Sequence, residues 1–182
     1  MAQRRTMIVL DGDNIDRDFF QHQINFERFC TMAIGDDIKV GFVLFWTIIN
    51  QYRADLCKIL EQLNFNVFSY QLRGDDRVAG KRQGYSDMDI SNYLDIRVIH
   101  DDFDRLILAT ADTDFANKIK LLQQYHRKRV EVVFASDVHV SSALIEQADY
   151  FWDLADPTIQ ERIRNYMPEN AFTLDLLRQP MP

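Results

Sequence analysis

The sequence has few of the residues that break regular structure or cross-link a chain. Among 182 residues there are six glycines, four prolines and two cysteines, Cys30 and Cys57. So few glycines and prolines exclude a fibrous or loop-rich protein, and a hydrophobic content of 47% excludes a disordered one. The two cysteines lack the spacing of a redox or zinc motif. We therefore expect reduced thiols in the core, as is usual in a cytoplasmic protein.

Long hydrophobic runs are also absent from the sequence. No run approaches the roughly 20 apolar residues that span a bilayer. The N-terminus leads into a short apolar run, Met7 to Leu10, which ends at Asp11. This length predicts a buried strand rather than a signal peptide. We therefore expect a cytoplasmic protein without a membrane partner.

An excess of basic residues is missing as well. Lys and Arg number 21 against 28 Asp and Glu, which gives a formal net charge of -7. A general nucleic-acid coat depends on many contacts between basic side chains and phosphates, so this charge argues against one. It does not exclude a nuclease, because bound metal ions neutralise part of an aspartate cluster.

The hydrophobic pattern alternates between short strand-like runs and longer helical stretches. Strands are predicted for residues 6–11, 39–46, 66–71, 105–110 and 130–134, and helices for 26–33, 48–63, 87–99, 115–125 and 141–148. The strand runs are almost continuously apolar, as expected for strands that are covered on both faces. The pattern predicts an α/β fold with three layers, α/β/α, around a mainly parallel sheet of about five strands.

The sequence predicts one main domain with a short extension. Residues 1–156 are expected to form the domain. From residue 157 the pattern changes to a charged helix, 158–166, and a tail that runs to residue 182. We expect residues 157–182 to pack on the domain or to extend from it.

Aspartates follow two of the predicted strands directly. Asp11 and Asp13 come at the end of the first strand, and Asp112 and Asp114 follow the fourth. Right-handed crossovers bring the carboxyl ends of parallel strands to one edge of the sheet, where ligands bind. A single aspartate at such a place is often only a helix cap or a turn residue. Two strands that end in carboxylates at the same edge are harder to explain by capping.

A third acidic group lies in the helix predicted at residues 87–99. Asp87 and Asp89 fit its first turn, where the helix dipole favours anions, and Asp95 lies further along. Carboxylates that are close together repel one another unless they bind cations, and hard oxygen ligands suit Mg²⁺ or Mn²⁺. Such ions activate water and stabilise the leaving oxygen of a phosphodiester. The four histidines have no zinc spacing, and neither a P-loop nor a G-x-S-x-G motif is present.

Several motifs follow one another in an order that resembles a known family. They are Asp11-Gly12-x-Asn14 after an apolar strand, Asp89-x-x-x-x-x-Asp95, Thr110-Ala111-Asp112-x-Asp114-Phe115, Lys128 to Val132, Ser142-Ala143-Leu144 and Ala148 to Phe151. Over about residues 6–153 the chain resembles the NYN domain family, a branch of the PIN-like nucleases that includes the LabA-like proteins. The family usually has Ser-Gly-Asp-Gly-Asp-Phe in the third motif, so this chain lacks both glycines and keeps both carboxylates.

The resemblance implies a PIN-like fold and an endoribonuclease that depends on Mg²⁺ or Mn²⁺. By resemblance, the metal ligands would be Asp11, Asp89, Asp112 and Asp114, with Asp95 as a further candidate. Asn14 would position a ligand or the scissile phosphate. The expected partner is RNA, either single-stranded or structured.

Residues 73–86 form one long polar segment shortly before Asp89. It carries four basic residues that we expect to guide an RNA backbone toward the metal ions: Arg73, Arg77, Lys81 and Arg82. A solvated connector is an equally good interpretation.

Two aromatic pairs also have two interpretations. Phe19-Phe20 and Phe151-Trp152 are expected in the core. If they were exposed instead, they would form a surface for a homodimer.

Two other functions compete with the ribonuclease. One is a NYN-like module that binds RNA or a protein without turnover. The other is an aspartate-nucleophile phosphatase that uses Asp11 and Asp13, in which Asp112 and Asp114 would supply the late acidic pair. The phosphatase interpretation leaves Asp89 without a role.

Overall fold

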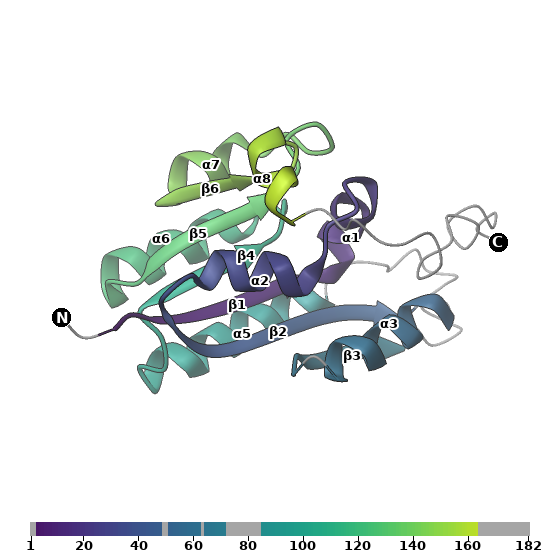
Figure 1. The fold of residues 1–182 in the computed structure, drawn as a ribbon. Coiled ribbons are helices and arrows are strands. Elements are labelled where there is room, and N and C mark those ends of the chain that lie inside the picture. Colours follow the sequence, from purple (N-terminus) through teal and green to yellow (C-terminus); the bar gives the residue numbers. More distant parts are fainter. Residues whose placement is uncertain (1–2, 49–50, 63, 72–84, 164–182) are drawn as a thin grey trace.

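The computed structural model describes residues 3–48, 51–62, 64–71 and 85–163. Its strands are β1 (Arg5–Asp11), β2 (Ile38–Ile48), β3 (Asn66–Gln71), β4 (Arg105–Ala109), β5 (Arg129–Phe134) and β6 (Tyr150–Asp153). They form one sheet in the order β3-β2-β1-β4-β5-β6, and all neighbouring strands are parallel. Figure 1 shows the strands side by side, with α1 at the end where β1 finishes.

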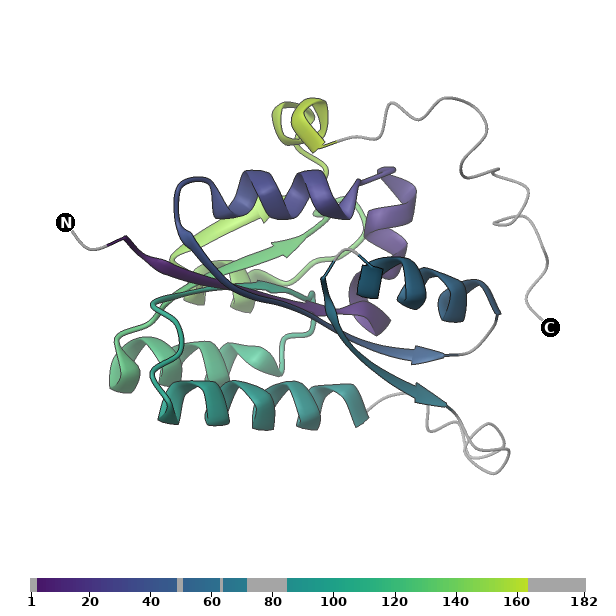
Figure 2. The ribbon, with the colours of Figure 1, turned by 60° about the horizontal axis from the view of Figure 1, so that its bottom comes forward.

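Helices cover both faces of this sheet. On one face lie α1 (Gly12–Gln21), α2 (Phe26–Ile34), α3 (Gln51–Gln62) and α8 (Pro157–Ile163). On the other face lie α5 (Tyr85–Ile99), α6 (Phe115–His126) and α7 (Ser142–Gln147). In Figure 2, α2 lies above the sheet and α5 and α6 lie below it. The three-layer α/β/α fold is confirmed, with six strands rather than the expected five.

The central strand β1 is buried along almost its whole length. Ile8 and Leu10 pack on the side of α1 and α2, whereas Met7 and Val9 pack on the side of α5 and α6. Successive side chains of a strand point to opposite faces, so a strand that is covered on both faces is apolar at every position. By the same alternation, Asp11 follows Met7 and Val9 onto the face that α5 covers.

The order of the strands reverses at β1. β2 and β3 lie to one side of β1, and β4, β5 and β6 lie to the other. In parallel α/β sheets, ligands bind beyond the carboxyl ends of the strands at this switch point. β1 ends at Asp11, and β4 ends just before the segment that carries Asp112 and Asp114. The fold therefore brings the two acidic strand ends to the same place.

Two elements are missed by the sequence prediction. Helix α1 begins with Gly12 and contains three aspartates and an asparagine, residues that favour turns and caps over helix interiors. Strand β6 has only four residues, Tyr150–Asp153, and two of them are the aromatic pair Phe151-Trp152. Both elements are short, and both depend on contacts with distant parts of the chain.

Several predicted boundaries are also wrong. Ile48 ends β2 instead of starting a helix, and α5 begins at Tyr85 rather than at Asp87. The last described helix, α8, begins at Pro157. Proline suits the first position of a helix because an amide hydrogen there would have no acceptor within the helix. Helix α8 packs on the domain, since Ile163 is buried and its carbonyl accepts a hydrogen bond from the Asn25 amide.

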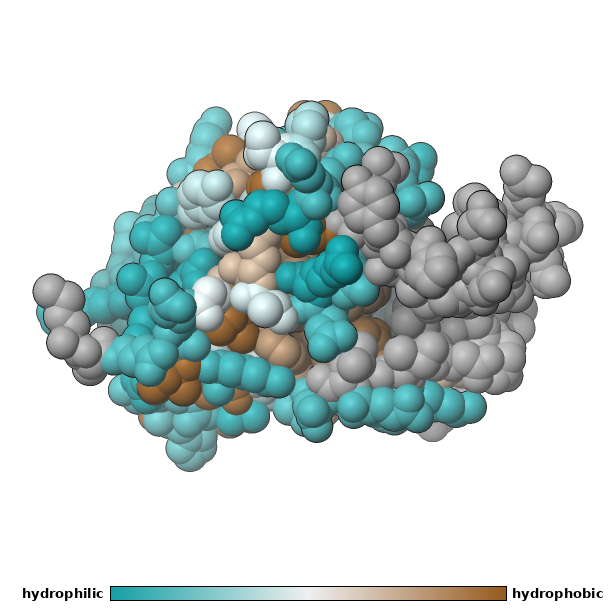
Figure 3. All heavy atoms as spheres, viewed as in Figure 1, coloured by the Kyte–Doolittle hydropathy of each residue, from teal (hydrophilic) through white to brown (hydrophobic). Residues whose placement is uncertain are grey.

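Some of the predicted core residues are fully buried, whereas Phe151 and Trp152 are half-buried and the side chain of Phe20 lies outside the described part of the structure. Cys30 and Cys57 are free thiols and are buried. Phe19 is buried, and Phe151 packs against Phe134 with ring centroids 4.5 Å apart. On the face drawn in Figure 3, hydrophobic residues form small separate groups among hydrophilic ones. Within the described ranges, no helix combines the length and the hydrophobicity that a membrane span needs.

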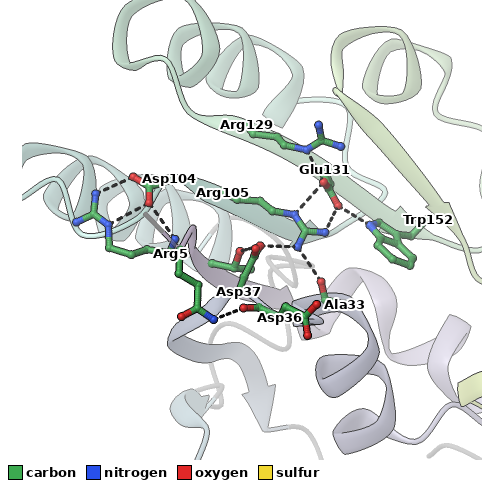
Figure 4. Close-up of polar contacts among 11 residues, drawn as sticks. Arg5, Ala33, Asp36, Asp37, Asp104, Arg105, Arg129, Glu131 and Trp152 are labelled. Carbon is green, nitrogen blue, oxygen red and sulfur yellow. Dashed lines mark hydrogen bonds and ion pairs between the residues drawn. The ribbon is translucent and has the colours of Figure 1, made fainter. Parts of the chain in front are cut away.

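A buried ion network joins the strands at the opposite edge of the sheet, where they begin (Figure 4). Arg105 of β4 donates to both carboxylate oxygens of Glu131 of β5, at 2.8 and 2.6 Å. It also donates to the carbonyl of Ala33 and to Asp37, which lie at the end of α2 and before β2. Trp152 of β6 donates to Glu131 at 2.8 Å. Glu131 and Arg105 are both buried, so the network fixes four elements around a desolvated charge pair.

We expect Glu131→Gln to destabilise the protein by about 3–5 kcal/mol at pH 7, because it leaves the Arg105 charge buried without its partner. Burial raises the pKa of Glu131, but hydrogen bonds from Arg105, Arg129 and Trp152 outweigh this and hold it below the usual 4.5. A lowered carboxyl pKa stabilises the fold above pH 4.5 and loses that effect as the pH falls. The difference from the wild type should therefore shrink at pH 3–4.

Urea unfolding at pH 7 and at pH 3.5 measures this difference. Glu146→Gln, on the exposed surface of α7, serves as the control. A Glu131→Gln protein as stable as this control at pH 7 would contradict the account of the network.

Candidate metal centre

Asp11 lies at the carboxyl end of β1 and is 1% exposed. Its Oδ2 atom accepts a hydrogen bond from the Thr110 hydroxyl at 2.9 Å, and Thr110 follows directly after β4. Its Oδ1 atom is buried and has no hydrogen-bond partner among the described residues. A buried oxygen without a hydrogen-bond partner destabilises a folded protein, and such atoms are rare. The atom is therefore a candidate for binding something other than protein.

The electrostatic surroundings of Asp11 are unfavourable to its negative charge. Burial raises its pKa to about 7, and the charges of Asp87, Asp13 and Asp112 contribute to the rise. The hydrogen bond from Thr110 acts in the opposite direction but is too weak to compensate. Carboxylates from β1, from α1, from the start of α5 and from the segment after β4 thus lie close enough to repel one another. A cation among them would relieve both the burial and the repulsion.

At the start of α1, the backbone of residue 12 lies so close to β2 that only glycine fits. A Cβ atom on Gly12 would lie 2.7 Å from the Trp46 side chain and 2.9 Å from the Phe45 carbonyl oxygen. The absence of a side chain therefore lets the backbone after Asp11 pass directly against β2.

Helix α1 holds the ends of three strands through its own side chains. Asp13 accepts hydrogen bonds from the amide and the hydroxyl of Thr47 near the end of β2. Asn14 accepts one from the amide of Ala111, just after β4, at 3.1 Å. One turn later, Asp18 accepts one from the amide of Ala135, just after β5, at 2.7 Å. The helix therefore acts as a clamp along this edge of the sheet, and Asn14 positions the turn that carries Asp112.

The segment after β4 is a compact turn built on Thr110. The Thr110 hydroxyl accepts a hydrogen bond from the Asp112 amide at 3.1 Å while it donates to Asp11. Asp112 in turn accepts one from the Asp114 amide through Oδ1, at 2.9 Å. Asp114 stands at the N-cap of α6, but its side chain makes no capping hydrogen bond and is exposed. Capping therefore does not account for Asp114.

The three aspartates of α5 have different surroundings. Asp87 precedes the buried Ile90 by three residues, so it lies on the face that packs on the sheet, and its charge acts on Asp11. Asp89 is half-buried and points about 200° around the helix from Asp87. Asp95 accepts two hydrogen bonds from Lys118 of α6, at 2.7 and 2.8 Å, and is exposed. Within α5, Asp87 is therefore the carboxylate whose charge contributes to the raised pKa of Asp11, and the roles assigned to Asp89 and Asp95 stay predictions.

Two participants are not among the residues selected from the sequence. Thr110 stands within a recognised motif without an assigned role, and its hydroxyl links Asp11 to Asp112. For Asp87, the sequence indicates only a place in the first helical turn. The four basic residues expected to contact RNA, Arg73, Arg77, Lys81 and Arg82, lie outside the described residues.

Comparison with known proteins identifies the family. The NYN domain profile matches residues 5–155, most of the chain. The chain belongs to the NYN domain family. NYN domains are PIN-like nucleases, which usually act with divalent metal ions. No curated protein matches this chain.

A solved structure supports the fold of this NYN domain. The chain is similar to a protein of unknown function from Vibrio parahaemolyticus, with a TM-score of 0.65 and 24% sequence identity. The match covers 83% of this chain and 93% of the other. At this identity the likeness supports the fold alone.

The residues at the switch point fit a hard divalent cation. In the described part of the chain, no three histidine, cysteine or acidic side chains are close enough together to hold a metal ion by themselves. Mg²⁺ does not require such a cage, because it is usually held by one or two carboxylates and keeps several water molecules. Asp11 offers a buried oxygen that no described residue hydrogen-bonds, and the charge of Asp112 contributes to the raised pKa of Asp11. This donor set suits Mg²⁺ or Mn²⁺ rather than a soft metal.

We expect Asp11→Asn to stabilise the metal-free protein above pH 7. Because burial raises the pKa of Asp11 from 3.8 to about 7, the folded state keeps a proton between about pH 4 and pH 7 that the unfolded state releases there. Stability should therefore fall as the pH rises from about 4 to 7, and the variant should escape this loss. The gain should be about 2–4 kcal/mol at pH 8 and should vanish near pH 4.

Melting in EDTA across this pH range tests the expectation, with Asp36→Asn, at an exposed residue before β2, as the control. Adding Mn²⁺ at pH 8 should stabilise the wild type and leave Asp11→Asn almost unchanged. An Asp11→Asn protein that is less stable than the wild type at pH 8 in EDTA would overturn this view of the site.

Proposed function

We propose that this NYN domain is a metal-dependent ribonuclease that hydrolyses RNA phosphodiester bonds at the carboxyl end of β1. The proposal depends chiefly on one observation. Asp11 buries a carboxylate oxygen that has no hydrogen-bond partner in the described part of the chain, and other carboxylates contribute to its raised pKa. A site that keeps such a group has a cost in stability, which cation binding would offset.

Asp11 and Asp112 would hold Mg²⁺ or Mn²⁺, with Asp87 nearby. Asp89 and Asp114 remain candidate ligands from the family resemblance. When bound, the metal would lower the pKa of a water molecule and stabilise charge on the phosphate oxygens. The protein itself contributes the geometry around it. Thr110 fixes the orientation of the Asp11 carboxylate by a 2.9 Å hydrogen bond.

The clamp formed by α1 supports the same site. Asn14 holds the amide of Ala111, so the turn that carries Asp112 stays beside Asp11. Asn14 therefore acts as a positioning residue in this proposal, through the turn rather than through the phosphate. Rigid ligands with such support are what catalysis by metal ions requires.

The phosphatase alternative is weaker. It requires Asp13 to act as an acid or a base beside a nucleophilic Asp11. Asp13 instead accepts hydrogen bonds from the amide and the hydroxyl of Thr47, which ties it to β2. A module that binds RNA without turnover would use the same residues, so only an activity assay separates it from the nuclease.

We expect Asp112→Asn to abolish RNA cleavage while the fold remains intact. The change removes one ligand charge and relieves repulsion on Asp11, so the melting temperature should hold or rise. Cleavage of a labelled single-stranded RNA is measured with Mn²⁺ and with EDTA. Asp101→Asn is the matched control, because Asp101 is exposed and pairs with Arg5 and Lys128 at the other end of the sheet. Full activity of Asp112→Asn would sink the proposed role.

The basic segment before α5 supplies a test of the substrate. Replacing Arg77, Lys81 and Arg82 together by Ala should weaken binding to every RNA sequence alike, because phosphate contacts do not read bases. On single-stranded RNA, the dependence of log affinity on log salt should flatten by about 0.7 for each basic side chain that binds a phosphate in the wild type.

Binding is measured with Ca²⁺ in place of Mg²⁺ to suppress cleavage. Lys120→Ala, exposed on α6, is the control. If the triple variant has the same salt dependence as the wild type, the segment is a solvated connector and does not bind phosphates.

A further inference from the structure

Two histidines lie close together beyond the carboxyl end of β5, and their hydrogen bonds differ. His22 uses both ring nitrogens, Nε2 with Asp137 at 3.0 Å and Nδ1 with Gln160 at 2.7 Å. Its side chain is only 10% exposed. His139 uses Nε2 with Asp18 at 2.8 Å, and its Nδ1 atom has no hydrogen bond to any described residue. Its side chain is 28% exposed. Both ring nitrogens of His22 thus form hydrogen bonds within the fold, whereas Nδ1 of His139 forms none with the described residues.

The partner of His139 is a fully buried carboxylate. Asp18 is 0% exposed, and it accepts the amide of Ala135 through Oδ2 and the His139 ring through Oδ1. Burial raises the pKa of Asp18 above its usual value, and the Ala135 amide and His139 offset only part of this rise. A buried carboxylate on one ring nitrogen fixes the orientation of an imidazole. Asp18 therefore holds the His139 ring in place and leaves Nδ1 for a ligand.

The sheet places His139 beside the candidate metal centre. The strand register puts Leu10 opposite Ala109 and Ala109 opposite Val133, so the next residues, Asp11, Thr110 and Phe134, form one row. The His139 ring packs edge-on against Phe134, with centroids 6.4 Å apart. Two strand spacings of about 4.8 Å separate Asp11 from Phe134 along the row. Phe134 thus lies roughly 10 Å from Asp11, and His139 packs on Phe134 at the flank of the site formed by β5.

We propose that His139 binds a backbone phosphate of the RNA next to the one that is cleaved. The inference rests on the proposed function and extends its site from β1 and β4 to β5. To donate to Asp18 and to a phosphate at once, the ring must carry both protons. In the complex, Asp18 accepts from Nε2 and the phosphate accepts from Nδ1 in a charge-assisted hydrogen bond.

The test compares two histidine variants in RNA binding. Affinity for a labelled single-stranded RNA is measured in Ca²⁺ across a salt series for the wild type, His139→Gln and His22→Gln. Gln keeps a donor toward the aspartate and lacks the charge. His139→Gln should lower affinity about tenfold and flatten the salt dependence by up to about 0.7. His22→Gln should affect stability and leave RNA binding as in the wild type.

Charge restoration and spectroscopy separate binding from folding. His139→Lys should recover part of the salt dependence, because the cation is restored. In NMR spectra of the wild-type protein, the His139 ring signals should shift on RNA addition while those of His22 stay in place. This measurement remains decisive even if His139→Gln melts near the assay temperature.

The outcomes separate this inference from the proposed function. If the wild type binds RNA and His139→Gln binds with the same affinity and salt dependence, His139 is only a structural clamp and the inference is wrong. If the wild type neither binds nor cuts RNA while the His139 signals also stay unchanged, the ribonuclease proposal fails as well. Loss of affinity in both histidine variants to the same extent would also overturn a specific role for His139.

Discussion

Asp11 ends the central strand with its carboxylate removed from water, and a charge in that position is unstable without a partner. Burial and neighbouring carboxylates raise its pKa to about 7, and among the described residues only the Thr110 hydroxyl donates a hydrogen bond to it. The surrounding structure holds the arrangement in place. Gly12 brings α1 directly against β2, and Asn14 fixes the turn after β4. In our account, a divalent cation completes this site and links the fold to its chemistry.

Buried carboxylates at the two edges of the sheet differ in the hydrogen-bond donors around them. Where the strands begin, Glu131 accepts hydrogen bonds from Arg105, Arg129 and Trp152, so its pKa falls below the usual value. Where β1 ends, Asp11 accepts a hydrogen bond from one described residue, Thr110, and burial raises its pKa. The first edge stabilises the fold. At the second edge, burial and like charges destabilise the ionised carboxylate of Asp11, and groups with such perturbed pKa values are common at functional sites.

The sequence predicts most of this fold because parallel strands covered on both faces are apolar at every position. β1 and β4 are recognised in this way, and Asp11 and Asp112 follow from where these strands end. Helix α1 escapes prediction because its aspartates and asparagine bond to the ends of other strands, which no local pattern reveals. The pair of Asp18 and His139 spans 121 residues of sequence, so only the folded chain brings it together.

The choice between two carboxylates of α5 shows a second limit of prediction from sequence. Asp87 and Asp89 differ by two positions, and which of them faces Asp11 depends on the phase of the helix on the sheet. Buried Ile90 and Leu94 set that phase, and they favour Asp87. The family motif alone points to Asp89. Composition and motif spacing cannot choose between the two, because both residues fit the first turn.

The most direct test of the account is anomalous diffraction from a crystal of the protein soaked in Mn²⁺. A bound Mn²⁺ should give a peak within about 2.0–2.2 Å of a carboxylate oxygen of Asp11, with Asp112 as a further ligand or one water molecule away. The peak should disappear from crystals of Asp11→Asn. A peak elsewhere, with the Asp11 carboxyl still buried and unpartnered at a pH above 7, would contradict the central claim.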